Sequence, residues 1–178
     1  CYAGQELGER GMDNEGFSGT DGRSTIFDYW APDTLSRWYK DGELSDKHLT
    51  REEIDLKSFY SRLFNICTTE NAIGKGLFFD LMYVNPDSEQ FNAHKEYAFL
   101  RKYNNEMLLI VANFSDKAQH SQVVIPEHAF RYLQIENRGR VNAVELFTGQ
   151  NVTIDLQPNS PVNVQIPANG AIILKCKA

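Results

Sequence analysis

The chain has 178 residues, of which 42% are hydrophobic and 12% aromatic, which is enough for one packed domain or one domain with an attached segment. Its net charge of −6, with the basic residues scattered, disfavours nucleic acid and anionic membranes as partners. No run of about eighteen apolar residues occurs, so the sequence predicts no membrane-spanning helix.

The first residues, Cys1 to Gly8, read as the end of a buried strand that runs into a glycine-containing loop. Neither a methionine nor a signal peptide precedes them, so we expect the chain to be part of a longer protein. Glu6 is open to three interpretations: a general acid, a ligand-binding carboxylate, or a structural carboxylate bonded to loop amides. The structural role is favoured, because glycosidase chemistry needs a second carboxylate about 5–10 Å away.

Acidic and aromatic residues crowd the loop-rich segment that extends to about residue 48. The acidic residues Asp13, Glu15, Asp21 and Asp28 lack the spacing of a calcium-binding loop, and a solvated loop is the favoured interpretation.

The aromatic residues of this segment are Phe27, Tyr29, Trp30, Trp38 and Tyr39. The apolar side of a pyranose matches a flat aromatic surface, so this group indicates either sugar stacking or the cover of a core. Trp30 and Trp38 are the better stacking candidates. Glu6, Trp30, Trp38 and Tyr39 are therefore the candidate substrate-binding residues, and no residue is a candidate catalytic group.

A helix is predicted after this loop-rich segment. Thr50 and Glu53 have the spacing of a capping box, which marks the first turn of a helix. Apolar residues then recur on one helical face, namely Leu56, Phe59, Tyr60, Leu63, Phe64 and Cys67. Cys67 is predicted to be buried there, and Gly74 and Gly76 to end the helix. This apolar helix face needs a large surface to pack against.

From about residue 76 onward the pattern is strand and turn. Predicted strands cover residues 77–84, 97–103, 107–114, 123–125, 130–134, 141–147, 152–156, 162–166 and 171–176. The first of these is nearly all apolar, which is typical of a strand covered on both faces. Asn104-Asn105 and residues 148–151 are predicted hairpin turns. Roughly eight short strands joined by tight turns indicate a mainly β fold, an antiparallel, Greek-key-like β-sandwich.

The cysteines and histidines predict no metal site. Cys1, Cys67 and Cys176 are widely spaced and odd in number, which also argues against a disulfide framework. The four histidines, His48, His94, His120 and His128, lack the spacing of metal ligands.

Several segments together resemble the α-amylase family of glycoside hydrolases, in particular Bacteroides-type bacterial α-amylases. Residues 2–9, with Gly-x-Glu-x-Gly, resemble the segment around the eighth barrel strand, and residues 17–30 the loop that follows. Residues 56–66 resemble the last barrel helix, and residues 74–78 the entry into the C-terminal domain. Residues 108–115 (LLIVANFS) resemble the hallmark strand of that domain. The resemblance implies a barrel remnant over residues 1–75 and a C-terminal β-sandwich over 76–178.

What this resemblance implies about activity follows from position. In the family the nucleophilic aspartate, the acid/base glutamate and a third aspartate come from barrel strands four, five and seven, which precede the matched segments. The parent would hydrolyse α-1,4-glucosidic bonds with retention, and this chain alone would be inactive. Its partners would be the missing N-terminal barrel and α-glucan. The uncovered helix face would favour self-association.

The resemblance leaves some matters open. It implies no cofactor here, although calcium is frequent in the family and would be held by residues of the parent. Secretion or a periplasmic location of the parent is compatible with it but not decided. One alternative is a stand-alone carbohydrate-binding module with exposed aromatics such as Tyr97, Tyr103 or Tyr132 on one sandwich face. Another is a trehalose- or sucrose-cleaving relative.

Overall fold

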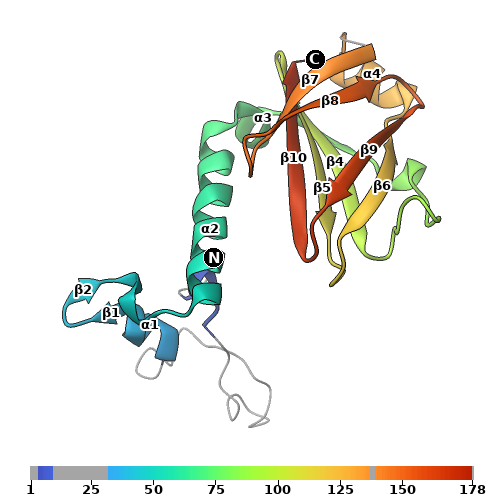
Figure 1. Ribbon diagram of the computed structural model, residues 1–178. Helices are drawn as coiled ribbons and strands as arrows, with labels where there is room; N and C mark the ends of the chain where they lie inside the picture. The colour runs from blue at the N-terminus through green and yellow to red at the C-terminus, as the bar shows by residue number, and fades with distance from the viewer. Residues whose placement is uncertain (1–3, 10–31, 137–138, 178) are drawn as a thin grey trace, which may run out of the picture. The chain divides into compact units, whose positions relative to one another are not determined.

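The structure is a computed structural model that describes residues 4–9, 32–136 and 139–177 (Figure 1). The chain divides into two compact units, residues 1–65 and 66–178. Of the segment from Cys1 to Gly8, predicted as a strand end that runs into a loop, residues 1–3 lie outside the described residues, and so do residues 10–31 of the loop-rich segment.

The first unit is built from short elements and the start of one long helix. In chain order these are η1 (Gln5–Leu7), α1 (Asp33–Trp38), β1 (Tyr39–Lys40), β2 (Glu43–Leu44), η2 (Asp46–His48) and α2 (Arg51–Thr69), which continues into the second unit. The predicted capping box is present: the Thr50 amide donates to Glu53 Oε2 over 2.7 Å, and the Glu53 amide donates to Thr50 Oγ1 over 3.3 Å. The helix therefore begins where the sequence predicts.

Helix α2 ends earlier than the glycines suggest. It stops at Thr69, and Glu70 takes an extended conformation before a second short helix, α3 (Asn71–Lys75). Gly76 then ends α3, where an added Cβ would come within 2.7 Å of the Lys102 carbonyl oxygen. The prediction that Cys67 is buried is wrong: Cys67 is exposed, and Ile66 is the buried residue of this turn. Consecutive helical residues are rotated by about 100°, so only one of the two can face the packed side.

The second unit contains two antiparallel sheets (Figure 1). The larger has the order β3-β4-β5-β10-β7-β8, and the smaller pairs β6 with β9. The strands are β3 (Leu77–Asp80), β4 (Glu96–Tyr103), β5 (Glu106–Asn113), β6 (Gln119–Val124), β7 (Gly139–Glu145), β8 (Asn151–Leu156), β9 (Pro161–Ile166) and β10 (Gly170–Lys177). These eight strands of the second unit confirm the predicted antiparallel β fold.

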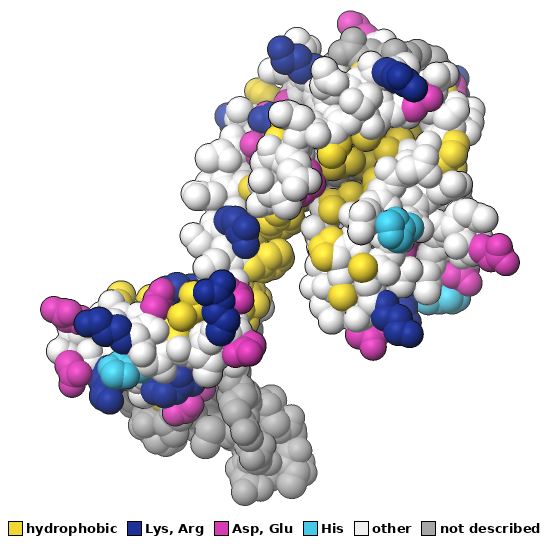
Figure 2. All heavy atoms as spheres, in the orientation of Figure 1, with side chains coloured by type: hydrophobic (Ala, Val, Ile, Leu, Met, Phe, Trp, Pro, Cys, Tyr) yellow, Lys and Arg dark blue, Asp and Glu magenta, His cyan; other side chains and the backbone are white. Residues whose placement is uncertain are grey.

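The main hydrophobic core lies between the two sheets. Strand alternation places Ala98 and Leu100 of β4 on the inner face, and Val162, Val164 and Ile166 of β9 opposite them, all buried. A cavity of about 560 Å³, lined by residues of β8, β9 and β10, opens from this core. Figure 2 shows hydrophobic side chains at the floor of a hollow in this unit. The smaller sheet thus leaves part of the larger one uncovered.

Both predicted hairpins are confirmed. Strands β4 and β5 pair from Tyr103 and Glu106 onward, and Asn104 has a φ of 50°, which asparagine tolerates in tight turns. Strands β7 and β8 pair from Val144 and Asn151 onward.

Two strand predictions are wrong. Residues 77–84 form only the short strand β3 and the 3-10 turn η3 (Met82–Val84), and Leu77 and Phe78 are exposed, not covered on both faces. Residues 130–134 belong to helix α4 (Glu127–Leu133). The buried residues there, Ala129, Phe130 and Leu133, have helical spacing. No helix of the described residues is long and apolar enough to cross a membrane.

Candidate functional site

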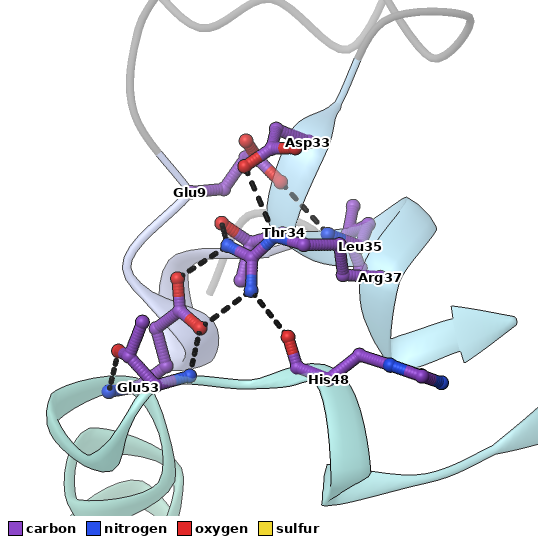
Figure 3. A network of polar contacts seen from close by, with 8 residues as sticks. Glu9, Asp33, Thr34, Leu35, Arg37, His48 and Glu53 are labelled. Carbon is purple, nitrogen blue, oxygen red and sulfur yellow. Dashed lines mark hydrogen bonds and ion pairs between the residues drawn. The ribbon is translucent and has the colours of Figure 1, made fainter.

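The candidate site predicted from the sequence falls in the first unit, and three of its four residues, Glu6, Trp38 and Tyr39, lie on either side of the segment 10–31. Gly4 opens a tight turn with a φ of 86°, and its carbonyl accepts from the amides of Leu7 and Glu9. Glu9 Oε2 in turn accepts from the Leu35 amide at 2.9 Å (Figure 3). This contact joins the chain just before the segment to helix α1 just after it.

Arg37 is the centre of the polar network in this unit. Its guanidinium makes a bidentate contact with Glu53, at 2.9 and 2.6 Å, and also donates to the His48 carbonyl oxygen at 2.7 Å. The remaining donors reach Asp33 at 3.1 Å and Thr34 at 3.5 Å. Figure 3 shows these groups converging on the guanidinium from α1, η2 and α2. All five N–H donors of Arg37 are used, so none is free for a substrate.

The charges of this network reinforce each other. The hydrogen bond from Arg37, with the Thr50 amide adding to it, lowers the pKa of Glu53 to about 2, and burial only partly opposes this. The same contact raises the pKa of Arg37 further above its ordinary range. Glu53 is therefore a carboxylate fixed as an acceptor, which suits a structural role and not proton transfer at neutral pH.

Trp38 and Tyr39 are the two predicted stacking residues that the structure describes. Trp38 is half-buried; its indole N–H donates to Asp46 Oδ1 at 3.2 Å, and Lys57 Nζ lies 5.5 Å from the ring centroid. Lys57 also forms an ion pair with Asp46. Tyr39 pairs with Leu44 in the short hairpin and is 61% exposed. One face of Trp38 is thus taken by a cation, while Tyr39 is open to solvent.

The other two predicted site residues are placed differently. Glu6 lies half-buried in η1 beside Gln5, whose side-chain amide donates to the Tyr60 hydroxyl at 3.0 Å. Trp30 lies outside the described residues, as do Asp13, Glu15, Asp21 and Asp28. Within the described part of the chain, no group of three or more His, Cys, Asp or Glu is placed to hold a metal ion. Sequence reasoning missed the Arg37–Glu53 contact because the two residues are sixteen positions apart and no motif links them.

The second unit carries a different feature, an apolar outer face on its six-stranded sheet. We define the outer sheet face as the side of β3, β4, β5 and β10 that carries Phe78, Tyr97, Phe99, Leu108, Ile110 and Ile173. Ile66, Ala72 and Ile73 cover one end of this face and form a second hydrophobic cluster with it. Arg101 Nε fixes this cover by donating to the Ala72 carbonyl oxygen at 3.0 Å. Beside this cover Phe78 and Tyr97 stay exposed, with ring centroids 5.5 and 5.6 Å from that of Phe99.

Comparison with known families gives a direct match for this second unit. The sequence profile described as the C-terminal all-beta domain of α-amylase matches residues 87–177. The chain belongs to this family. The resemblance to α-amylases predicted from the sequence is thereby confirmed, although the Bacteroides-type assignment stays a prediction.

Solved structures agree on the fold. The chain is similar to the α-amylase of Geobacillus thermoleovorans in complex with acarbose, with 15% identity, a TM-score of 0.54, and coverage of 99% of this chain and 29% of that one. It is also similar to AmyP in complex with maltose (15% identity, TM-score 0.52, coverage of 76% and 22%). A third is the maltogenic α-amylase AmyB of Thermotoga neapolitana (14% identity, TM-score 0.51, coverage of 77% and 28%). No curated protein sequence matches this chain.

The α-amylase C-terminal domain is therefore the established part of this chain. The chain spans between about a fifth and three tenths of the length of the amylases that it resembles. Identities near 15% indicate a shared fold, and activity has to be argued from the residues themselves. In this chain the network around Arg37 fixes local structure, and the outer sheet face presents apolar surface.

Proposed function

We propose that this chain is the C-terminal part of an α-amylase-like glycoside hydrolase, in which the β-sandwich supports a catalytic barrel formed by the rest of the longer protein. The parent reaction would be hydrolysis of α-1,4-glucosidic bonds in starch-like glucans with retention of configuration. The boundary between the barrel remnant and the sandwich is proposed at residues 75 and 76. The observation that carries the proposal is the outer sheet face.

This face is unusual for a surface in contact with water. Leu108 and Ile110 are buried in the second cluster, yet the rings of Phe78, Phe99 and Tyr97 continue it into solvent. Contiguous exposed apolar surface beside a covered apolar cluster is typical of an interface between domains. A barrel packed against Phe78 and Tyr97 would complete the cover that Ile66 and Ala72 begin.

A catalytic role for the chain by itself has little support. A retaining glycosidase needs two carboxyl groups about 5–5.5 Å apart. Glu53 is held by Arg37, and Glu9 accepts from the Leu35 amide. We therefore propose that the catalytic carboxylates lie in the longer protein, and that calcium, if bound there, is held by the barrel.

The test compares release of reducing sugar from soluble starch by the 178-residue chain and by the longer protein under identical conditions. Activity of the longer protein alone supports the proposal. Activity of the chain that is lost in Glu6→Gln would show that Glu6 is catalytic and that the proposal is wrong.

The interface itself has a second test. In the longer protein, Tyr97→Asp is expected to lower the melting temperature of the barrel, because a charge would be buried against it. Tyr83→Asp is the control, since Tyr83 is exposed and lies in η3, outside the outer sheet face. Equal effects of the two changes would contradict the proposed packing.

We also propose that the isolated chain self-associates through the apolar face of α2. Phe64 is 46% exposed, and Leu56, Phe59 and Leu63 are only half-buried. Sedimentation velocity at increasing concentration is expected to show a dimer that Phe64→Ser weakens. A chain that stays monomeric up to high micromolar concentration would disprove this.

The alternative of a stand-alone carbohydrate-binding module needs several exposed aromatics on one sandwich face. Tyr97 and Tyr132 are both exposed, but Tyr97 lies on the outer sheet face and Tyr132 comes from α4, against Phe79 of the main core. Tyr103 shares the side of Tyr97 but packs against the second cluster. Tyr103 and Tyr132 line one pocket, which Tyr97 does not reach. The three tyrosines therefore do not form one exposed aromatic face, which favours the accessory role.

A further inference from the structure

The cavity that opens from the main core runs along the edges of two strands. Its volume is about 560 Å³, and its lining includes consecutive residues of both strands, 152–154 of β8 and 163–166 of β9. Successive side chains of a strand point to opposite faces, so a cavity over one face is lined by every second residue. Lining by consecutive residues therefore places this cavity beside the backbone edges of β8 and β9. Figure 1 shows the two strands diverging from their connecting turn.

The edge of β8 carries unpaired backbone groups. This strand is the last of the larger sheet, and of the described strands only β7 pairs with it. At their hairpin the Glu145 amide donates to the Gln150 carbonyl oxygen at 2.9 Å, which makes these two residues a hydrogen-bonded pair. Hydrogen-bonded and non-hydrogen-bonded pairs alternate along an antiparallel ladder, so every second residue of β8 bonds to β7. The residues whose N–H and C=O groups point to the free edge are then Asn151, Thr153 and Asp155.

The edge of β9 beside the cavity is less complete. Among the described strands, β9 pairs with β6 alone. The Gln122 amide of β6 donates to the Gln90 carbonyl oxygen at 2.8 Å, so it points away from β9 and from its opposite residue, Asn163. The backbone groups of Asn163 and Gln165 therefore point to the free edge of β9. Pro161, at the same side of this strand, has no N–H to donate, so β8 offers the longer row of donors.

The lining of the cavity suits an uncharged occupant. Its apolar part comes from both sheets and includes Ile154, Val164, Ile166, Ile172 and Leu174. Glu145 is the one charged residue among the described lining residues, and no basic side chain accompanies it. Its carboxylate accepts from the Phe147 amide at 3.1 Å and from the Thr148 amide and hydroxyl at 2.8 and 2.7 Å. The carboxylate is thus already satisfied and does not call for a cation.

The free edge and the apolar lining together specify an extended peptide. A row of outward N–H and C=O groups is completed by another strand, and an apolar cavity beside it takes that strand's alternate side chains. We propose that β8 binds an extended segment of another protein chain, antiparallel to it, uncharged, and apolar at every second residue. The segment bonds to the backbone of Thr153, and its apolar side chains fill the cavity over Val164 and Ile166. None of the lining residues belongs to the outer sheet face, so binding here is independent of the proposed function.

The test is a titration of the ¹⁵N-labelled 178-residue chain with a blocked peptide of about seven alternating threonine and valine residues. Amide chemical shifts are expected to change along β8, with a dissociation constant on the order of 1 mM. Hydrogen exchange is expected to slow at the amides of Thr153 and Asp155, because the peptide carbonyl groups accept from them.

Two methylated peptides serve as matched probes that leave the protein unchanged. Opposite residues of an antiparallel pair share a face, so the valines enter the cavity and the threonines bond to the edge of β8. Methylation of the threonine amide nitrogens is therefore expected to abolish binding. Methylation of the valine amide nitrogens, which point away from β8, is expected to weaken it less than about threefold.

Two proline variants test the same edge from the side of the protein. Thr153→Pro removes an outward N–H without removing a hydrogen bond to β7, and should weaken peptide binding about tenfold or more. Asn163→Pro is the matched control, because it makes the same change on the edge of β9, and should alter the dissociation constant less than about twofold.

Several results would overturn the proposal. No shift changes at about 10 mM peptide, shifts outside β8 and the cavity lining only, or equal binding of the two methylated peptides would show that no strand adds to β8. Loss of binding in Asn163→Pro and not in Thr153→Pro would place the peptide on β9 instead. Slower exchange along β8 at rising chain concentration without peptide would identify a second copy as the occupant. None of these results depends on whether the chain or its parent hydrolyses starch.

Discussion

Different kinds of interaction stabilise the inside of each of the two units. In the first unit, only Gly4, Leu7 and Thr34 of the described residues are buried, and the network around Arg37 ties the elements together. In the second unit, a large hydrophobic cluster fills the space between the sheets. The stability of the first unit therefore depends on charge and pH, whereas the stability of the second unit depends on the apolar area that folding removes from water.

The largest effect is expected from a cavity in the second unit. Leu109 is fully buried in the main core, so Leu109→Ala should destabilise this unit by about 2–5 kcal/mol. Urea unfolding followed by circular dichroism measures the loss. Tyr39→Ala, at an exposed position of the first unit, is the control and should change stability little. A loss below about 1 kcal/mol for Leu109→Ala would mean that the core is not well packed.

Loss of the central cation should be the next largest effect, and it should be local to the first unit. Arg37→Ala leaves the mostly buried Glu53 carboxylate without its bidentate partner, which should cost about 1–3 kcal/mol. Hydrogen exchange is expected to speed up at residues 33–54 and to stay unchanged in the strands of the second unit. Arg51→Ala is the matched control, because its ion pair with Asp55 is exposed and should contribute less than about 0.5 kcal/mol.

How much of this could be predicted from the sequence depends on the range of each signal. The capping box of Thr50 and Glu53 and the turn at Asn104 are local patterns, and both predictions are confirmed. Residues 130–134 are predicted as a short strand, yet tertiary packing buries Phe130 and Leu133 on one side of a helix. Local patterns therefore specify where elements begin and turn, but not always their type.

The candidate site was harder to predict than the fold. Residue type alone makes Glu6, Trp38 and Tyr39 candidates. The residues that contact the Trp38 side chain, Asp46 and Lys57, come from other elements. The pocket beside Tyr132 joins three segments that no motif connects. Contacts between distant segments depend on the whole fold, and a single sequence does not display them.

Acid should act on the first unit through Glu53. The folded-state pKa of Glu53 is about 2, below its ordinary value of 4.5, so its contribution to stability is present above pH 4.5 and is lost as the pH falls towards 2. Glu53→Gln should lower stability at pH 7 and flatten the response between pH 5 and pH 2. Hydrogen exchange at the first turn of α2, measured across this range, tests it. An unchanged acid response in Glu53→Gln would assign the acid sensitivity to other carboxylates.

The smallest expected effect on stability comes from Glu96 in the second unit, and its pH dependence is opposite to that of Glu53. Glu96 is 3% exposed; its Oε1 accepts from Ser121 Oγ at 2.8 Å, while Oε2 has no partner among the described residues. Burial raises the pKa of Glu96 above its usual 4.5, so stability is fully present below that value and declines as the pH rises through the folded-state pKa. Glu96→Gln keeps the acceptor for Ser121 and removes the buried charge. It should therefore raise the melting temperature at pH 7 and leave it nearly unchanged at pH 4. If Glu96→Gln is less stable than the unchanged chain at both pH values, the charged carboxylate is stabilised in the folded state, for example by water. The two units would then respond to acid in the same direction.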